Sequence, residues 1–176
     1  MARRTTMNFS EFSYGYALTE KLISWAGTAL VAAPIFPSLI EEGQTGGYDL
    51  NLTFPGIVLF LQFKLSRLMG KRASEYRKRI LDVPFYRVEL RTGVSRQHEL
   101  LLKLEKSYKW VYYVAPTFHE VADLNDAYLK GQILDRSILV APSAIGPLPD
   151  AKPHHLSRWS KEPLQIRRQE PPVLDG

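Results

Sequence analysis

Residues 48–65 read YDLNLTFPGIVLFLQFKL, and they predict a β-hairpin at the centre of the fold. Polar and apolar residues alternate in the middle of residues 48–54, which is typical of a half-buried strand. Pro55-Gly56 is a turn dipeptide. Residues 57–65 are almost continuously apolar, which favours a strand buried on both faces. The two runs should therefore pair as antiparallel neighbours in a sheet.

The expected pairing brings three polar side chains together. A turn centred within Pro55-Gly56 sets Asp49 opposite Gln62. A four-residue loop, which suits proline better than a two-residue loop, keeps the same pairing. Lys64 lies two residues beyond Gln62 and therefore points to the same face of its strand. Asp49, Gln62 and Lys64 thus converge on one face of otherwise apolar strands.

The rest of the chain predicts helices and further strands around this hairpin. Asn8 or Ser10 can cap a helix that runs to about Trp25 and stops at Gly27. Further elements are expected at residues 29–40 (an irregular strand), 67–79 (a short helix or a loop), 85–91 (a strand), 96–108 (a helix capped by Ser95), 110–115 (a strand closed by Pro116), 119–129 (a helix) and 138–140 (a strand). This order predicts a mixed α/β (α+β) fold in which helices cover a central sheet.

Length and composition indicate a globular domain. The chain has 176 residues, 45% of them apolar, and no cysteine, which excludes disulfides, thiolate metal sites and cysteine nucleophiles. Pro34 and Pro37 interrupt the longest apolar stretch, so we expect no membrane span. No apolar run follows Arg3 and Arg4, so we expect no signal peptide. The lack of cysteine favours a reducing compartment, and we expect a cytoplasmic location. We expect one domain at residues 8–160 and a flexible, proline-rich tail at residues 161–176. The histidines are interpreted as surface or packing residues: His98, His119, His154 and His155.

A carboxylate and an ammonium on apolar strands need a partner, because a buried charge is costly unless it is paired or liganded. The structural interpretation is an ion pair between Asp49 and Lys64. The functional interpretation is a Mg²⁺ (or Mn²⁺) site for phosphodiester hydrolysis, since Mg²⁺ prefers hard oxygen ligands. Asp49 would supply a carboxylate, while the Gln62 side chain and the Phe63 carbonyl would add neutral oxygens. Lys64 would hold the attacking water and stabilise developing negative charge.

Two motifs resemble those of the PD-(D/E)xK nuclease superfamily: Gly46-Gly47-Tyr48-Asp49, and Gln62-Phe63-Lys64 in the apolar strand that follows. The form is the QxK variant, as in Mrr-type restriction enzymes. The resemblance implies a restriction endonuclease-like fold, with a central mixed sheet flanked by helices. It also implies that Glu20 on the preceding helix is a catalytic metal ligand, and that Gln97 near the start of a later helix approaches the site. Gln62 replaces the usual second acid, which removes one negative charge from the metal site.

A basic segment follows the hairpin. Residues 67–79 hold six lysines and arginines against one acid, Glu75. A charge run of this kind is usually a solvated face, but beside a phosphodiesterase site it would bind phosphates without sequence preference. The residues expected to contact nucleic acid are Arg67, Lys71, Arg72, Arg77 and Lys78, together with Gln97.

Two functions fit these features. The first is a Mg²⁺-dependent nuclease, a phosphodiester hydrolase acting on DNA. The resemblance implies a role in restriction, phage defence or repair for such an enzyme, as a homodimer or as the nuclease subunit of a larger defence complex. The alternative is a catalytically inactive nuclease-fold subunit that binds nucleic acid or a protein partner. The glutamine at position 62 favours this alternative, since it weakens the negative charge of the metal site.

Overall fold

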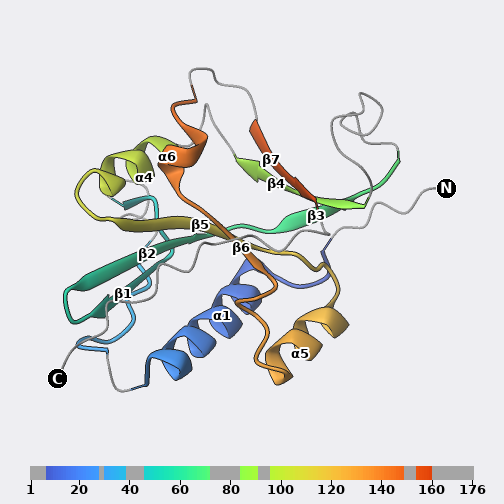
Figure 1. The fold of residues 1–176 in the computed structure, drawn as a ribbon, viewed down its shortest axis with the longest axis horizontal. Coiled ribbons are helices and arrows are strands. Elements are labelled where there is room, and N and C mark those ends of the chain that lie inside the picture. Colours follow the sequence, from blue (N-terminus) through green and yellow to red (C-terminus); the bar gives the residue numbers. More distant parts are fainter. Residues whose placement is uncertain are drawn as a thin grey trace.

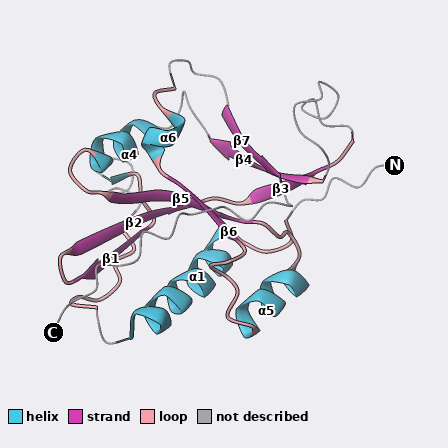
Figure 2. Ribbon diagram, in the orientation of Figure 1, coloured by secondary structure: helices cyan, strands magenta, loops and turns pink. Residues whose placement is uncertain are grey.

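Two β-sheets form the framework of the molecule. The computed structural model describes residues 7–27, 30–38, 46–71, 84–90, 96–148 and 154–159. Within these residues the strands form a four-stranded sheet, in the order β1-β2-β5-β6, and a three-stranded sheet, in the order β3-β4-β7 (Figure 2). The strands are β1 (Leu50–Phe54), β2 (Ile57–Phe63), β3 (Ser66–Met69), β4 (Phe85–Leu90), β5 (Trp110–Pro116), β6 (Ser137–Val140) and β7 (His154–Trp159). The helices are α1 (Glu11–Ala26), α4 (Gln97–Glu105), α5 (Val121–Leu129) and α6 (Pro142–Ile145). The predicted mixed α/β class is confirmed.

The predicted hairpin is confirmed together with its register. β1 and β2 are antiparallel, and Leu50 lies opposite Leu61, so that positions 49 and 62 meet. The expectation of a four-residue loop is wrong, because Phe54 already pairs with Ile57 and the loop has only two residues. Gly56 has a φ of +71°. A positive φ at the second central position is characteristic of a type II turn, which accepts proline at the first, and glycine adopts it without strain.

Helices cover both faces of the four-stranded sheet (Figure 1). α1 and α5 lie on one face, where Leu18 of α1 packs in a buried cluster with Leu61 of β2. α4 and α6 lie on the other face, where Leu101 of α4 packs with Phe60 of β2. Side chains alternate along a strand, so Gln62 shares the face of Phe60 and α4 rather than the face of Leu61 and α1.

The first helix has the predicted cap and stop. Ser10 is the N-cap of α1, and its hydroxyl accepts a hydrogen bond from the Ser13 main-chain nitrogen at 3.0 Å. Gly27 follows the last turn. Asn8, the alternative cap, serves a different helix: its side-chain oxygen accepts from the Val121 main-chain nitrogen of α5 at 2.6 Å. A residue ahead of α1 thus satisfies a free N–H group at the start of α5.

Part of the basic segment is a strand, which corrects the prediction of a short helix or a loop. Ser66–Met69 forms β3 because it pairs with β4, and the Ser66 hydroxyl donates to the Pro116 carbonyl of β5. The irregular strand expected at residues 29–40 is represented by one isolated bridge between Ile35 and Asn51 of β1. That bridge extends the four-stranded sheet beyond β1.

The C-terminal half contains elements that the sequence did not indicate. α4 starts one residue later and ends three residues earlier than predicted, with Arg96 at its N-cap. The predicted cap, Ser95, lies outside the described residues. α6 and β7 have no counterpart in the prediction, since prolines from position 142 onward favour loops. The proposed tail, residues 161–176, also lies outside the described part of the chain.

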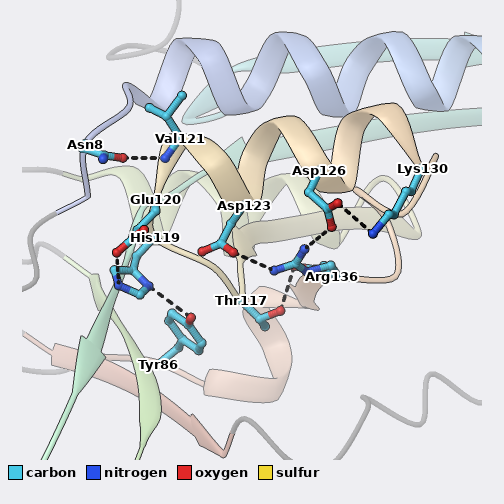
Figure 3. A network of polar contacts seen from close by, with 10 residues as sticks. All are labelled: Asn8, Tyr86, Thr117, His119, Glu120, Val121, Asp123, Asp126, Lys130 and Arg136. Carbon is cyan, nitrogen blue, oxygen red and sulfur yellow. Dashed lines mark hydrogen bonds and ion pairs between the residues drawn. The ribbon is translucent and has the colours of Figure 1, made fainter.

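A polar network joins the three-stranded sheet to the rest of the fold (Figure 3). The hydroxyl of Tyr86 in β4 lies 3.3 Å from Nδ1 of His119, just before α5. Arg136 lies 3.7 Å from both Asp123 and Asp126 of α5. Burial raises the pKa of Tyr86, and the Asp123 carboxylate raises it further. The contact between Tyr86 and His119 joins β4 to the segment just before α5.

Candidate functional site

Asp49 lies directly before β1, beside the C-terminal end of β2. Its main-chain nitrogen donates to the Leu61 carbonyl at 2.8 Å, which continues the hairpin by one residue. Its Oδ2 accepts two further hydrogen bonds, from the Phe63 main-chain nitrogen at 2.7 Å and from Nε2 of Gln62 at 2.6 Å. Hydrogen bonds to a carboxylate are stronger than those between neutral groups. The carboxylate of Asp49 is therefore fixed against the end of β2.

Gln62 is the central side chain of the site. It is only 1% exposed, and its Nε2 also donates to the carbonyl of Phe63 at 3.1 Å. Its Oε1 is buried and has no hydrogen-bond partner among the described residues. A buried polar atom without a partner costs about 1–3 kcal/mol. The amide that carries this oxygen lies beside a carboxylate and a carbonyl, which makes the oxygen a candidate ligand for a cation.

The donor set fits a hard divalent cation. Asp49 offers a carboxylate oxygen and Phe63 a main-chain carbonyl, both within hydrogen-bond distance of the Gln62 amide, which carries a third oxygen. Mg²⁺ binds oxygen ligands of this kind and retains several waters, so it does not need a complete protein cage. Within the described residues there is no group of three or more His, Cys, Asp and Glu side chains placed to bind a metal. A cation here would consequently depend on neutral oxygens as well as on Asp49.

Lys64 follows the site directly. Its main-chain nitrogen donates to the Val114 carbonyl of β5 at 2.9 Å, and its side chain is half-buried. It lies one residue beyond the end of β2, and strand alternation predicts the face of Gln62 for its side chain. The described contacts of the Asp49 carboxylate are with Gln62 and Phe63, and the interpretation of Asp49 and Lys64 as an ion pair stays a prediction.

Glu20 occupies a different environment. It lies on α1, which covers the sheet face opposite to Gln62. Its Oε2 is 3.2 Å from Nζ of Lys21, which itself lies 4.4 Å from the centre of the Tyr128 ring. This separation is that of an ion pair, although the same buried oxygen accepts no hydrogen bond of good geometry. No described contact links Glu20 to Asp49 or Gln62, so its role as a metal ligand stays a prediction.

The start of α4 packs against the segment that carries Asp49. Gly47 has a φ of +66°, and a Cβ at this position would lie 2.8 Å from the main-chain oxygen of Gln97. Only glycine tolerates both this conformation and this close approach. The predicted proximity of Gln97 to the Asp49 segment is thus present at the level of the main chain.

A buried histidine, His98, lies behind the site. The sequence interpretation of the histidines as surface or packing residues includes its packing but not its hydrogen bonds. His98 is 2% exposed, and its Nε2 is 2.8 Å from the Gly146 carbonyl, which can only accept. Its Nδ1, 3.0 Å from the Tyr113 hydroxyl, therefore accepts from that hydroxyl in the neutral ring. Tyr113 lies opposite Gln62 on β5. The sequence does hold one signal for this position: His98 precedes Leu101 by three residues, which places both on one helix face.

Buried tyrosines predict how stability depends on pH. Burial raises the pKa of Tyr14 and of Tyr113 in the folded protein, whereas an unfolded tyrosine has a pKa of about 10. The contribution of these tyrosines to the free energy of unfolding should be fully present below about pH 10. It should fall above that pH, because only the unfolded chain then loses these protons. The slope is about 1.4 kcal/mol per pH unit for each tyrosine. Urea titrations from about pH 9 upward measure it, and Tyr14→Phe should make the slope shallower. An equal slope in wild type and Tyr14→Phe would contradict the assignment.

Two of the predicted phosphate-binding residues are described and exposed. Arg67 lies on β3, directly opposite Arg87 of β4, and Lys71 follows shortly after the strand. Like charges opposite one another in a sheet destabilise it slightly. The other predicted basic contacts lie outside the described residues: Arg72, Arg77 and Lys78.

Comparisons with protein-family models, with curated proteins and with solved structures find no match for this chain. In the described part of the chain, no helix combines the length and the apolar character that crossing a bilayer requires.

Proposed function

We propose that the protein is a divalent-metal-dependent nuclease that hydrolyses phosphodiester bonds, with DNA as its substrate. One observation carries the proposal: the Asp49 carboxylate, the Phe63 carbonyl and the buried amide of Gln62 lie together at the end of β2. The resemblance of the two motifs to the PD-(D/E)xK superfamily supports it. So does the confirmed hairpin, which brings those motifs together.

Each residue has a defined task in this proposal. Asp49, Phe63 and Gln62 would hold Mg²⁺ or Mn²⁺ through their oxygens, with Glu20 as a further predicted ligand. A cation held there would supply two effects, a lower pKa of a coordinated water and compensation of charge on the phosphate. Lys64 donates to the attacking water and to the phosphate oxygens. Arg67 lies on β3, only three residues beyond Lys64, and attracts the backbone phosphates.

Cleavage assays with the full chain test this function. Supercoiled plasmid and single-stranded DNA are incubated with the protein in Mg²⁺, in Mn²⁺ and in excess chelator. Nicking or cutting should occur with either metal and stop with the chelator. Salt-sensitive DNA binding with no cleavage in either metal would contradict the nuclease and support the alternative. An active nuclease would next be tested as a homodimer and as a cytoplasmic subunit of a restriction or phage-defence complex.

The alternative function has an observation of its own. Nε2 of Gln62 already donates to the Asp49 carboxylate and the Phe63 carbonyl, so these two oxygens have a hydrogen-bond donor without a metal. A nuclease-fold subunit that binds nucleic acid or a protein partner without turnover is consistent with that arrangement. Binding of Mg²⁺ at Asp49 separates the two functions, because only the nuclease requires it.

A further inference from the structure

The amide of Gln62 occupies the position among the oxygens that a cation would take. Its Nε2 is 2.6 Å from Asp49 Oδ2 and 3.1 Å from the Phe63 carbonyl oxygen, two of the oxygens assigned to the metal. An N–H donor carries partial positive charge, so it satisfies these oxygens as a cation would. The other end of the same amide, Oε1, is buried without a partner among the described residues. The amide is therefore oriented for the metal-free protein.

We propose that Gln62 is a two-position amide latch. In the metal-free protein its N–H₂ group holds Asp49 and the Phe63 carbonyl, and in the metal-bound protein the amide turns over and directs Oε1 toward the cation. This inference rests on the proposed function, because it concerns the same metal site. It adds that the glutamine sets the metal affinity of the site by competing with the ion for two of its ligands.

The packing around Gln62 permits its amide to rotate. The amide oxygen and nitrogen of glutamine are nearly equal in size, so exchanging them leaves the packing around a side chain that is 1% exposed unchanged. The turn leaves one amide atom without a partner in either position, since Oε1 has none in the present one. The loss on turning is the pair of hydrogen bonds from Nε2, and the gain is a ligand bond to the cation. Metal affinity is thus reduced by the stability of the latched position.

Nuclear magnetic resonance detects the turn without any assay of activity. In uniformly ¹⁵N-labelled protein without metal, the Gln62 side-chain amide should give a resolved pair of signals that exchange slowly with water. Gln62→Glu assigns that pair through its disappearance. Adding Mg²⁺ should shift this pair, together with the main-chain amide of Phe63, over the same concentration range. A Phe63 amide that shifts while the Gln62 pair stays unchanged would overturn the latch and leave the metal site intact.

Two substitutions test whether the Gln62 side chain sets the metal affinity of the site. Gln62→Glu removes the donor and adds a carboxylate, so Mg²⁺ affinity measured by calorimetry should rise by roughly tenfold or more. Gln62→Met keeps the length of the side chain but removes both amide atoms, and affinity should fall by roughly tenfold. Gln132→Glu is the matched control, because it makes the same chemical change at an exposed position after α5, and it should leave affinity unchanged.

The outcomes distinguish failure of the latch from failure of the proposed function. An affinity for Gln62→Glu that equals that of Gln132→Glu, or a Gln62→Met affinity as high as that of wild type, overturns the latch alone. Absence of Mg²⁺ binding in both wild type and Gln62→Glu overturns the metal site and the latch together. Binding by Gln62→Glu without binding by wild type supports the latch, with its closed position dominant, and favours the non-catalytic function for the natural chain.

Discussion

Replacing Asp49 with asparagine should remove Mg²⁺ binding and lower metal-dependent cleavage by roughly 10²–10³-fold. The substitution takes away the one described carboxylate that contacts Gln62 and Phe63 at the site. An asparagine oxygen can still accept from the Phe63 nitrogen, so most of the local structure should survive. Calorimetry measures the binding, and the initial rate of plasmid nicking measures the cleavage.

Controls separate the role of Asp49 from general effects. Asp135→Asn makes the same change at an exposed turn and should leave both measurements as in wild type. Lys64→Met should retain Mg²⁺ binding while cleavage falls, because the ammonium acts on water and phosphate rather than on the metal. Cleavage by Asp49→Asn at the wild-type rate would rule out Asp49 as a metal ligand. Asp49→Ala is less informative, since it leaves the buried donors of Gln62 and Phe63 unpaired at a cost of about 1–3 kcal/mol.

Gly47→Ala should have the second large effect, on both stability and site geometry. A side chain at the φ of this residue, +66°, costs about 1–2 kcal/mol. The added Cβ would also lie 2.8 Å from the main-chain oxygen of Gln97, so the start of α4 must move. Overpacking of this kind typically costs a further 1–3 kcal/mol or so. The free energy of unfolding from urea titration measures the sum, and Mg²⁺ affinity reports the displacement of Asp49.

Gly56→Ala is the matched control for this prediction. Gly56 has a similar φ of +71°, but a Cβ there meets no atom within 4 Å. It should therefore show the conformational cost alone and leave metal affinity unchanged. Equal destabilisation by the two substitutions would show that the contact between Gly47 and α4 carries no energy of its own.

Much of the central hairpin could be predicted because its signals are local. Alternating side chains and a turn dipeptide set the pairing of Asp49 with Gln62, whatever the rest of the chain does. The loop length could not be predicted with the same success, since a proline at Pro55 disfavours the two-residue hairpin turns that match strand twist. Gly56 resolves the conflict by adopting a positive φ.

The predicted site contains residues placed by local strand pairing and one residue, Glu20, placed by the packing of a helix. Asp49, Gln62 and Phe63 come together because neighbouring strands in register must bring them together. The placement of Glu20 depends instead on which face of the sheet α1 covers, and helical periodicity gives the direction of a helix face but not its partner. α1 packs on the face opposite to Gln62.

What the chain specifies through neighbouring residues is the mixed α/β class, the hairpin and its register, and the Ser10 cap of α1. What required packing in three dimensions is the cap that Asn8 provides for α5, the burial of His98 behind the sheet, and the direction in which the Gln62 amide points. The difference has one physical cause. Periodicity, capping and turn chemistry act over a few residues, whereas a buried hydrogen bond is chosen by partners that meet only when distant elements pack together.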